Sequence, residues 1–390
     1  MRVFRVTFLM FTILGAMCLQ ALAFTPSPTA DIVKRVRKSV IRIQGIDIGA
    51  EVASGGYGGG SGVVFQLDYD KGVAYALTNH HVSGDAVLSA VRFWDGTEYK
   101  AEMIAREPGI DVALLKLTGI PDERNVPESK KTIIAAPLGD SDKVQIGDHA
   151  IAMGSPGARD GFNANRDDPY QDYMLQQTVT DGVITGRDTV IGFVMGIWRQ
   201  NQASLGMQYG TNFPYAFRVT VPINGGNSGG PMFNDSGEVI GLNFYGGSHS
   251  LMQNSNHTVP INSAKDFAYQ ILNTGKFEKP WIGLDVIMPS YIKSPEAYNE
   301  FLERRKSKDL EIYGVRPDSS AERSGFRKGD VILSIDGRKI NTAHDLRQFV
   351  FNQPIGTRLS FEIKRGGSKL KDPITTEVQP KRFYDSEFSI

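Results

Sequence analysis

Short apolar stretches separated by turn-forming residues dominate residues 37–265. The clearest of them read SVIRIQGI, SGVVFQL, VAYALTN, AVRFW, DVALLKL, HAIAMG and EVIGLNF. Short strands that recur without helices between them are typical of antiparallel barrels and sandwiches. The pattern therefore predicts a mainly β domain over residues 37–265, and at this point either architecture is open.

A helix and a second unit are predicted after the last of these strands. Ser263 is a candidate helix cap, because an acid stands three residues after it and apolar residues follow at helical spacing. Gly275 suits the end of such a helix. We therefore expect a helix and linker over residues 266–279. Residues 280–384 then contain a helix after Thr342 and strands of their own, which read EIYGV, DVILSIDG and RLSFEIKR.

The strand pattern weakens between Pro156 and Phe217. A polar, turn-rich piece, GARDGFNANRDDPYQDY, is followed by the apolar TVIGFVMGIW and by an irregular segment. Loops this long inside a compact domain are usually functional or mobile. We predict such loops here, and the apolar piece is either a buried strand or an exposed contact surface.

The first 23 residues have the layout of a secretory signal peptide. Two early arginines precede the apolar VTFLMFTILGAMCL and the small-residue sequence Ala21-Leu22-Ala23. Cleavage after this sequence leaves residues 24–36 as an N-terminal segment and predicts a periplasmic protein. The alternative is a membrane anchor with periplasmic domains, although the stretch is shorter than the ~20 residues of a spanning helix. The only cysteine, Cys18, lies in this segment, so no disulfide is expected in the mature chain.

Length, composition and charge narrow the function classes. A chain of 390 residues suggests two or three domains, and its net charge of +0 argues against nucleic acid as a partner. The run GGYGGGSG at residues 55–62 lacks the lysine of a phosphate-binding loop, and we interpret it as a surface loop that leads into a strand. Four histidines without ligand spacing are expected to be surface or turn residues, namely His149, His249, His257 and His344. We therefore expect no cofactor and no metal.

The densest glycine cluster, INGGNSGGP, surrounds Ser228. Because glycine loses the most backbone freedom on folding, such a cluster indicates unusual backbone angles or a very close approach. GNSGG also satisfies G-x-S-x-G, the nucleophile elbow of α/β-hydrolases. That elbow needs a helix after the serine, whereas the chain continues with PMFNDSGEVIGLNF, which predicts a β-hairpin.

Suitable partners for Ser228 lie upstream of it. LTNHHVSG places His80 and His81 where a strand ends, and GIDVALLKL places Asp111 at the head of an apolar strand. The order His, Asp, Ser is that of chymotrypsin-type enzymes. A serine hydroxyl needs a base to take its proton, and a carboxylate must orient the imidazole. The predicted chemistry is acyl transfer, with the oxyanion held by the backbone N–H groups of Gly226 and Ser228.

The three motifs resemble those of the HtrA (Deg) family of exported serine proteases. TNHHV, DVALLKL and GNSGGP carry the likeness, which extends over about residues 40–385. The family pattern T-N-x-H-V implies that His81 is the catalytic imidazole, beside Asp111 and Ser228. The resemblance implies a mainly β fold, a chymotrypsin-like double β-barrel protease domain followed by a C-terminal PDZ domain of the α+β class.

The oxyanion hole is assigned to Gly226, Asn227 and Ser228. Gly225 departs from the family, which commonly has proline or another non-glycine residue there. We hypothesise that the added backbone freedom lets the oxyanion loop rest in an inactive, flipped arrangement. The segment from 158 to 217 also looks longer than is usual in the family.

A neutral specificity pocket is predicted from the position six residues before the nucleophile, where trypsin-like enzymes carry an aspartate. That residue is Pro222 here, so small or medium apolar side chains are the expected substrates. The strand GLNFYGG should line the pocket through Asn243, Phe244 and Tyr245, although either aromatic side chain suits core packing as well.

The second unit resembles a PDZ domain through PWIGLDV and YGVRPDSSAERSGFRKGDVILSIDGRKI. In such domains a peptide adds to a sheet edge and its C-terminal carboxylate binds backbone N–H groups of a small loop. The matching loop here consists of Trp281, Ile282, Gly283 and Leu284. The alternative is a PDZ-shaped module that serves only for packing.

The family resemblance implies a periplasmic serine endopeptidase of protein quality control that degrades unfolded or mislocalised proteins. Expected partners are protein or peptide substrates, peptide C-termini at the PDZ domain, and further copies of the chain in trimers or larger assemblies of trimers. A chaperone or peptide-binding scaffold with a dormant protease fold is the alternative. A dormant enzyme is expected to have lost a triad residue, and this chain retains all three.

Overall fold

The computed structural model describes residues 27–46, 59–83, 88–107, 110–155, 177–188, 215–245, 256–286 and 310–382. The predicted signal peptide, the apolar segment 189–198 and most of residues 158–217 lie outside the described residues, so the interpretations of these segments stay predictions. Among the helices that are described, none is long and apolar enough to cross a membrane.

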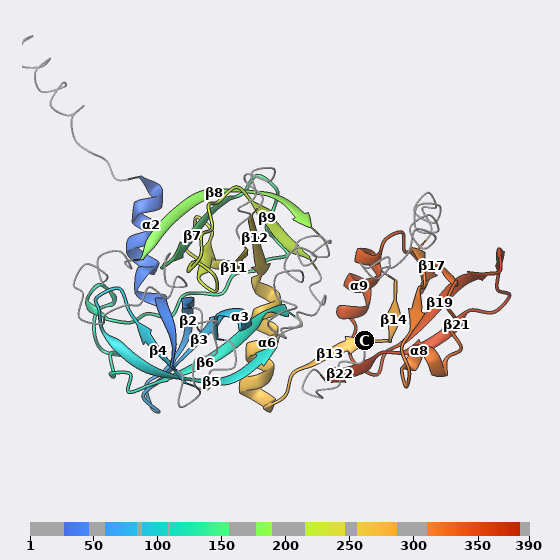
Figure 1. The fold of residues 1–390 in the computed structure, drawn as a ribbon, viewed down its shortest axis with the longest axis horizontal. Helices are drawn as coiled ribbons and strands as arrows, with labels where there is room; N and C mark the ends of the chain where they lie inside the picture. The colour runs from blue at the N-terminus through green and yellow to red at the C-terminus, as the bar shows by residue number, and fades with distance from the viewer. Residues whose placement is uncertain are drawn as a thin grey trace, which may run out of the picture.

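The first six strands form a closed antiparallel barrel in the order β1-β2-β3-β6-β5-β4 (Figure 1). They are β1 (Val40–Ile46), β2 (Gly60–Asp68), β3 (Val73–Thr78), β4 (Leu88–Arg92), β5 (Glu98–Glu107) and β6 (Val112–Thr118). The helix α2 (Pro28–Val36) and the 3-10 turn η1 (Arg37–Ser39) precede them, and the 3-10 turn η3 (Glu128–Lys130) follows. Ile41, Val64 and Leu115 fill the barrel and have no exposed surface. Their burial stabilises the fold by roughly 1.5–3 kcal/mol for each side chain.

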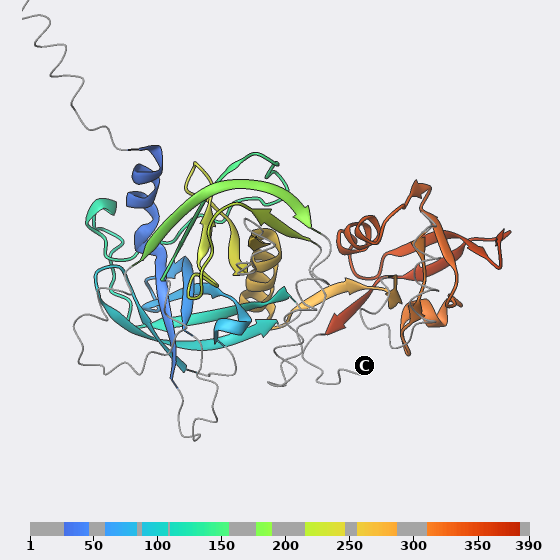
Figure 2. The ribbon, with the colours of Figure 1, turned by 45° about the horizontal axis from the view of Figure 1, so that its top comes forward.

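A second closed barrel follows, in the order β10-β11-β12-β9-β8-β7. Its strands are β7 (His149–Gly154), β8 (Thr178–Asp188), β9 (Ala216–Val219), β10 (Pro231–Phe233), β11 (Val239–Tyr245) and β12 (Asn256–Pro260). Figure 2 shows β8 curving over this barrel. The prediction of a chymotrypsin-like double barrel is confirmed, and a sandwich is excluded because each set of six strands closes on itself.

A single apolar cluster joins the two barrels to the helix α6 (Ile261–Thr274). Leu77 from the first barrel, Phe233 from the second and Phe267 from the helix have no exposed surface within it. The helix begins earlier than expected, because Pro260 is its N-cap and Ser263 lies inside its first turn. Its end at Gly275 is as predicted, since this residue has a φ of +70° and donates its N–H to the carbonyl of Ile271.

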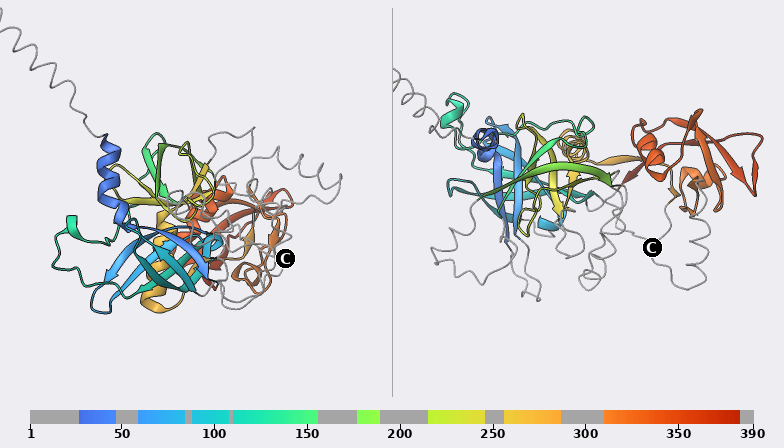
Figure 3. Two further views of the ribbon diagram at one scale, coloured as in Figure 1. Left: turned by 60° about the vertical axis from the view of Figure 1, so that its left-hand side comes forward. Right: turned by 90° about the horizontal axis from the view of Figure 1, so that it is seen from above.

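The C-terminal unit lies beyond α6, at the far end of the molecule (Figure 3). It consists of β13 (Glu278–Trp281), β14 (Leu284–Asp285), β15 (Leu310–Glu311), β16 (Gly314–Val315), α8 (Ser320–Arg323), β17 (Val331–Ile335), β18 (Arg338–Lys339), α9 (Ala343–Phe351), β19 (Arg358–Arg365), β20 (Ser368–Lys369), β21 (Ile374–Glu377) and β22 (Gln379–Arg382). The first of these strands pairs with the last, so the unit closes on its own core. The helix expected after Thr342 is α9.

Candidate active site

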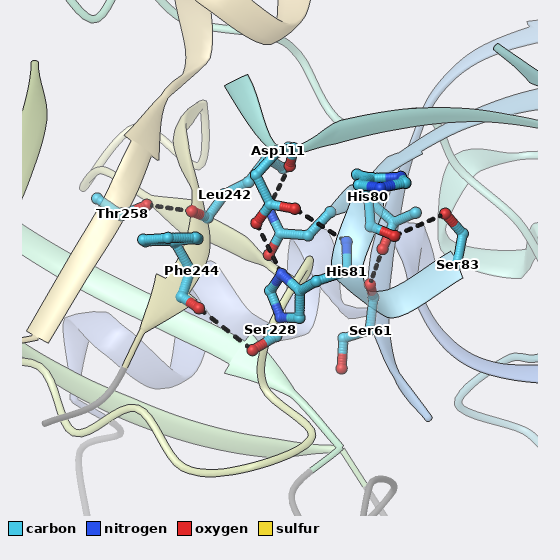
Figure 4. A network of polar contacts seen from close by, with 11 residues as sticks. Ser61, His80, His81, Ser83, Asp111, Ser228, Leu242, Phe244 and Thr258 are labelled. Carbon is cyan, nitrogen blue, oxygen red and sulfur yellow. Dashed lines mark hydrogen bonds and ion pairs between the residues drawn. The ribbon is translucent and has the colours of Figure 1, made fainter. Parts of the chain in front are cut away.

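The histidine motif forms one turn of helix, α3 (His80–Ser83), at the end of β3. His80 and His81 therefore lie just past the end of a strand, where the sequence placed them. The Nδ1 atom of His81 lies 2.6 Å from Oδ2 of Asp111, and the backbone N–H of His81 donates to Oδ1 of the same carboxylate at 2.9 Å (Figure 4). The structure thus brings together the two side chains that the motifs predicted as a pair.

Asp111 stands directly before β6, and its side chain is only 1% exposed. Its φ of +49° lies in the left-handed region, which aspartate tolerates better than most residues. The side-chain amide of Asn79 donates to its carbonyl at 2.9 Å. Because a buried carboxylate is tolerable only when its oxygens are satisfied, the two bonds from His81 explain why Asp111 can occupy this position.

Ser228 lies on the loop before β10, at the boundary between the barrels. Its hydroxyl donates to the carbonyl of Phe244 at 3.4 Å. The ring of Phe244 meets the imidazole of His81 edge-on, with 6.0 Å between the ring centroids. Ser228 is followed by the hairpin of β10 and β11, which excludes the α/β-hydrolase elbow.

The glycines around Ser228 are required by close approach and by backbone angle. A Cβ atom on Gly229 would lie 2.2 Å from the hydroxyl of Thr78 and 2.3 Å from the carbonyl oxygen of Ser61, and its φ is +78°. A Cβ atom on Gly230 would lie 2.3 Å from the carbonyl oxygen of Met153. The cluster therefore allows the loop to pack against strands of both barrels.

Several backbone N–H groups of this loop have acceptors within the structure. The N–H of Asn227 donates to the carbonyl of Asn224 at 3.0 Å, and that of Gly229 donates to a carbonyl of β11 at 2.8 Å. No described residue accepts a hydrogen bond from the backbone N–H of Gly226 or of Ser228. The chain therefore has two N–H groups next to the serine that can bind an anionic oxygen.

The predicted pocket residues differ in their surroundings. Pro222 is exposed, and its carbonyl accepts a hydrogen bond from the hydroxyl of Thr180 at 2.7 Å. Asn243 is fully buried, and its amide donates to two backbone carbonyls at 3.3 Å each. Phe244 is 4% exposed, and the side chain of Tyr245 lies outside the described part.

The predicted PDZ loop is anchored by its carbonyl groups. The carbonyl of Ile282 accepts from the N–H of Ala321, and that of Gly283 accepts from the N–H of Arg316, both at 2.9 Å. Gly283 has a φ of +87°, and a Cβ there would lie 2.1 Å from that of Ser319. Only glycine fits this position, as expected for a tightly packed turn. Trp281 and Leu284, at the two ends of the loop, are half-buried.

Two other interpretations need correction. The end of the glycine run, Gly60 to Gly62, lies within β2 and is buried, so it is not part of a surface loop. A Cβ atom on Gly60 would lie only 2.5 Å from a methyl group of Val82. His257 is buried on β12, where a surface or turn residue was expected. The earlier glycines of that run, residues 55–58, lie outside the described residues.

His149 is bound by two carboxylates, which its lack of ligand spacing did not indicate. Its Nδ1 lies 2.6 Å from Oδ1 of Asp235, and its Nε2 lies 3.3 Å from Oδ2 of Asp181. The hydrogen bond to Asp235 is the main reason why the pKa of His149 is raised. Among the residues that the structure describes, no three His, Cys, Asp or Glu side chains are grouped so that they could hold a metal ion.

Lys279 is buried where α6 meets the C-terminal unit. Its ammonium group lies 5.2 Å from the ring centroid of Phe277 and 5.5 Å from that of Phe351. Burial lowers its pKa to about 8, although the charges of Glu107 and Asp266 act in the opposite direction. The sequence around Lys279, the second residue of β13, does not indicate that this lysine is buried.

Comparison with known proteins agrees with both domains. Residues 60–242 match the trypsin-like peptidase domain, and residues 280–376 match the PDZ domain. The fold, the histidine–aspartate pair and the serine loop therefore define the class as chymotrypsin-like serine proteases that carry a PDZ domain.

Several similar proteins carry HtrA or DegP names. Serine protease Do-like HtrA of Bacillus subtilis (strain 168) is 27% identical over 330 residues, which are 83% of this chain and 65% of that protein. A probable periplasmic serine endoprotease DegP-like of Pseudomonas fluorescens is 31% identical over 328 residues, which are 84% of this chain and 57% of that protein. The solved structure of the HtrA-type protease AlgW with tripeptide has 27% identity and a TM-score of 0.61, and the match covers 91% of this chain and 98% of that chain.

Over most of its length the chain is similar to serine proteases of the HtrA/Deg family, and it contains the trypsin-like peptidase domain and the PDZ domain. It spans 65% and 57% of the lengths of the two curated relatives described above.

Proposed function

We propose that the protein is a serine endopeptidase in which Ser228 is the nucleophile, His81 the general base and Asp111 the orienting carboxylate. The observation that carries this proposal is the 2.6 Å hydrogen bond between Nδ1 of His81 and Asp111. A carboxylate at Nδ1 keeps the proton on that nitrogen, so Nε2 presents the lone pair that can take the serine proton.

The reaction requires a small rotation of the nucleophile. The Ser228 hydroxyl, which donates to the carbonyl of Phe244, turns toward Nε2 of His81 when a peptide binds. As Oγ attacks the scissile carbonyl carbon, its proton passes to Nε2, and the same proton is later given to the leaving amine. Asp111 remains ionised and stabilises the imidazolium.

The oxyanion is held by the backbone N–H groups of Gly226 and Ser228. Gly226 has a φ of +99° while Gly225 does not have a positive φ, and Asn227 closes the turn onto Asn224, which makes this a type II turn. A type I turn would reverse the peptide between Gly225 and Gly226. Since neither N–H is bonded to a described residue, these observations support a competent resting loop and oppose the hypothesis of an inactive flip.

The specificity pocket is proposed to accept small or medium apolar side chains. Pro222 brings no charge to the position where trypsin-like enzymes bind lysine or arginine through an aspartate. Phe244 closes one side of the site through its contact with His81, and Tyr245 follows it on the same strand. Asn243 supports this strand from within the barrel.

The PDZ domain is proposed to capture peptide C-termini. The carbonyls of Ile282 and Gly283 are bonded inward, toward Ala321 and Arg316. In a trans peptide the N–H points opposite to the carbonyl of the same plane, so the N–H groups of Gly283 and Leu284 point away from these partners. Two successive N–H groups of this kind can bind a carboxylate.

We further infer a role in periplasmic protein quality control. The periplasmic name of a relative at 31% identity supports export, and the family resemblance supports unfolded or mislocalised proteins as substrates and a trimer as the basic assembly.

Casein hydrolysis tests the enzymatic proposal. Wild-type protein should degrade casein and be labelled by a fluorophosphonate, whereas Ser228→Ala should do neither. Equal, poor degradation by both proteins together with suppression of aggregation by both would support the dormant scaffold instead.

A further inference from the structure

Ser61 links the oxyanion loop to the first barrel. It is the second residue of β2 and has no exposed surface. Its hydroxyl donates to the carbonyl of Gly226 at 2.7 Å and accepts from the backbone N–H of Ser155 at 2.9 Å. Ser155 directly follows β7 of the second barrel, so this one hydroxyl connects both barrels to the turn that carries the oxyanion donors.

The backbone of Ser61 makes a second connection to the same loop. Its N–H donates to the carbonyl of Ser228 at 2.8 Å, and its own carbonyl accepts from the hydroxyl of Thr78 at 2.7 Å. Figure 4 shows Ser61 beside the histidine helix, on the edge of the catalytic network. Thr78 ends β3 and is the first residue of the TNHHV motif, so Ser61 is itself held from the first barrel.

These bonds act on the peptide planes that flank the catalytic N–H groups. The carbonyl of Gly226 belongs to the plane between residues 226 and 227, and the carbonyl of Ser228 belongs to the plane between residues 228 and 229. The N–H of Ser228 lies in the plane between these two. Because the peptide unit is rigid, fixing its two neighbours leaves little freedom for the plane that carries this donor.

The Ser61 hydroxyl fixes a turn that is otherwise adaptable. The two central residues of this turn, Gly225 and Gly226, are glycines, which allow both signs of φ. Without the Ser61 hydroxyl, the buried carbonyl of Gly226 would lose its 2.7 Å donor. Rotation of the Gly226 peptide toward another donor would then move the N–H groups beside it.

We propose that Ser61 is a positioning residue that holds the oxyanion turn in its catalytic orientation through the hydroxyl bond to Gly226. This rests on the proposed endopeptidase function. Because Ser61 is fully buried, we expect it to act through the oxyanion donors on the transition state and not on substrate binding. Loss of one oxyanion donor costs roughly 10²–10³ in rate. Partial misplacement after Ser61→Ala should therefore lower kcat by about 10–100-fold and change KM by less than about threefold.

Ser39→Ala is the matched control. Ser39 is also a fully buried serine whose hydroxyl donates to a backbone carbonyl at 2.7 Å, but its acceptor is Val36 at the N-terminal helix. Ser61→Ala removes two buried hydrogen bonds and Ser39→Ala removes one, so both variants should lose unfolding midpoint, and Ser61→Ala should lose more. Only Ser61→Ala should lose kcat on a chromogenic peptide.

A peptide boronic acid provides a readout that general destabilisation would not move. It forms a tetrahedral adduct with the nucleophile, so its inhibition constant should rise in Ser61→Ala by the factor by which kcat falls.

The outcomes separate this proposal from the endopeptidase function itself. Wild-type kcat in a folded Ser61→Ala protein, or equal losses of kcat in Ser61→Ala and Ser39→Ala, would overturn the positioning role. If Ser61→Ala does not fold, Ser61→Cys decides, since it keeps only a weak donor and acceptor, and wild-type kcat in that variant would also overturn it. Casein hydrolysis that survives Ser228→Ala would instead overturn the endopeptidase function.

Discussion

The substitution Asp111→Asn isolates the electrostatic role that we propose for the carboxylate of Asp111. The side chains of aspartate and asparagine have nearly the same shape, and both tolerate the left-handed φ of +49° found at Asp111. The backbone carbonyl that accepts from Asn79 is not altered by the substitution. Asp111→Asn should therefore fold with an unfolding midpoint close to that of the wild type.

The magnitude follows from the two bonds that the carboxylate makes. The retained oxygen of the amide can still accept from the backbone N–H of His81, as Oδ1 of Asp111 does at 2.9 Å. The new NH₂ group then faces Nδ1 of His81, where Oδ2 lies at 2.6 Å, and it donates where the carboxylate accepted. The imidazole must carry its proton on Nε2, so it cannot take a proton from Ser228. We expect kcat to fall by about 10⁴-fold, equivalent to ~5.5 kcal/mol in the barrier.

Steady-state kinetics on a chromogenic peptide measure this loss, with the unfolding midpoint recorded on the same samples. Asp336→Asn is the matched control, because Asp336 has a similar φ of +47° and also accepts a backbone hydrogen bond, at 2.8 Å from Ser360, but lies in the PDZ domain. Its kcat should not change. A folded Asp111→Asn protein that keeps more than about a tenth of the wild-type kcat would refute the assigned role.

Three further predictions concern stability. The folded-state pKa of Lys279 is about 8, against an ordinary 10.5, so between these pH values the unfolded chain binds more protons than the folded one. The contribution of Lys279 to the free energy of unfolding should therefore rise by about 3 kcal/mol as the pH increases from about 8 to 10.5. Urea denaturation should show this rise in the wild type but not in Lys279→Met. The pKa of His149 is raised above 6.5, so its ion pair stabilises fully below that pH and is lost as the pH rises through the folded-state value; the midpoint difference between wild type and Asp235→Asn should be larger at pH 5.5 than at pH 8, and equal differences would contradict this. Gly229→Ala should destabilise by about 3 kcal/mol or more through collision and backbone strain, whereas Gly275→Ala, with a φ of +70° and nothing within 4 Å of its Cβ, should cost only about 1–2 kcal/mol in the same denaturation assay.

The local sequence was sufficient to predict the candidate site. Asp111 and the GNSGGP loop could be found because a catalytic residue and its supporting backbone are contiguous, so residue type and spacing retain the signal. The strand pattern was sufficient for a mainly β domain. It did not distinguish a barrel from a sandwich, because both bury alternate side chains, and only the pairing of β1 with β4 and of β7 with β10 closes the sheets.

Local rules failed where distant segments compete with local preference. Ser263 has the sequence of a helix cap, but the helix starts at Ile261, where the chain leaves β12 and its apolar side chain is fully buried. His257 shows no pattern of its own, and its burial depends on pairing with β9 and β11. The sequence suggests that Lys279 is a surface residue, but strand β13 buries it near the rings of Phe277 and Phe351.

The amino-acid sequence by itself determined which groups can react and where the backbone must bend, because side-chain chemistry and the need for glycine are properties of short segments. Only the tertiary structure decided that the N–H groups of Gly226 and Ser228 have no acceptor among the described residues, and that the Ser61 hydroxyl binds the carbonyl of Gly226. Ser61 and Gly226 are 165 residues apart, and a hydrogen bond over that separation exists only when both barrels have closed and packed against each other. The physical reason is that a hydrogen bond depends on distance and direction in space, and neither is encoded in local spacing along the chain.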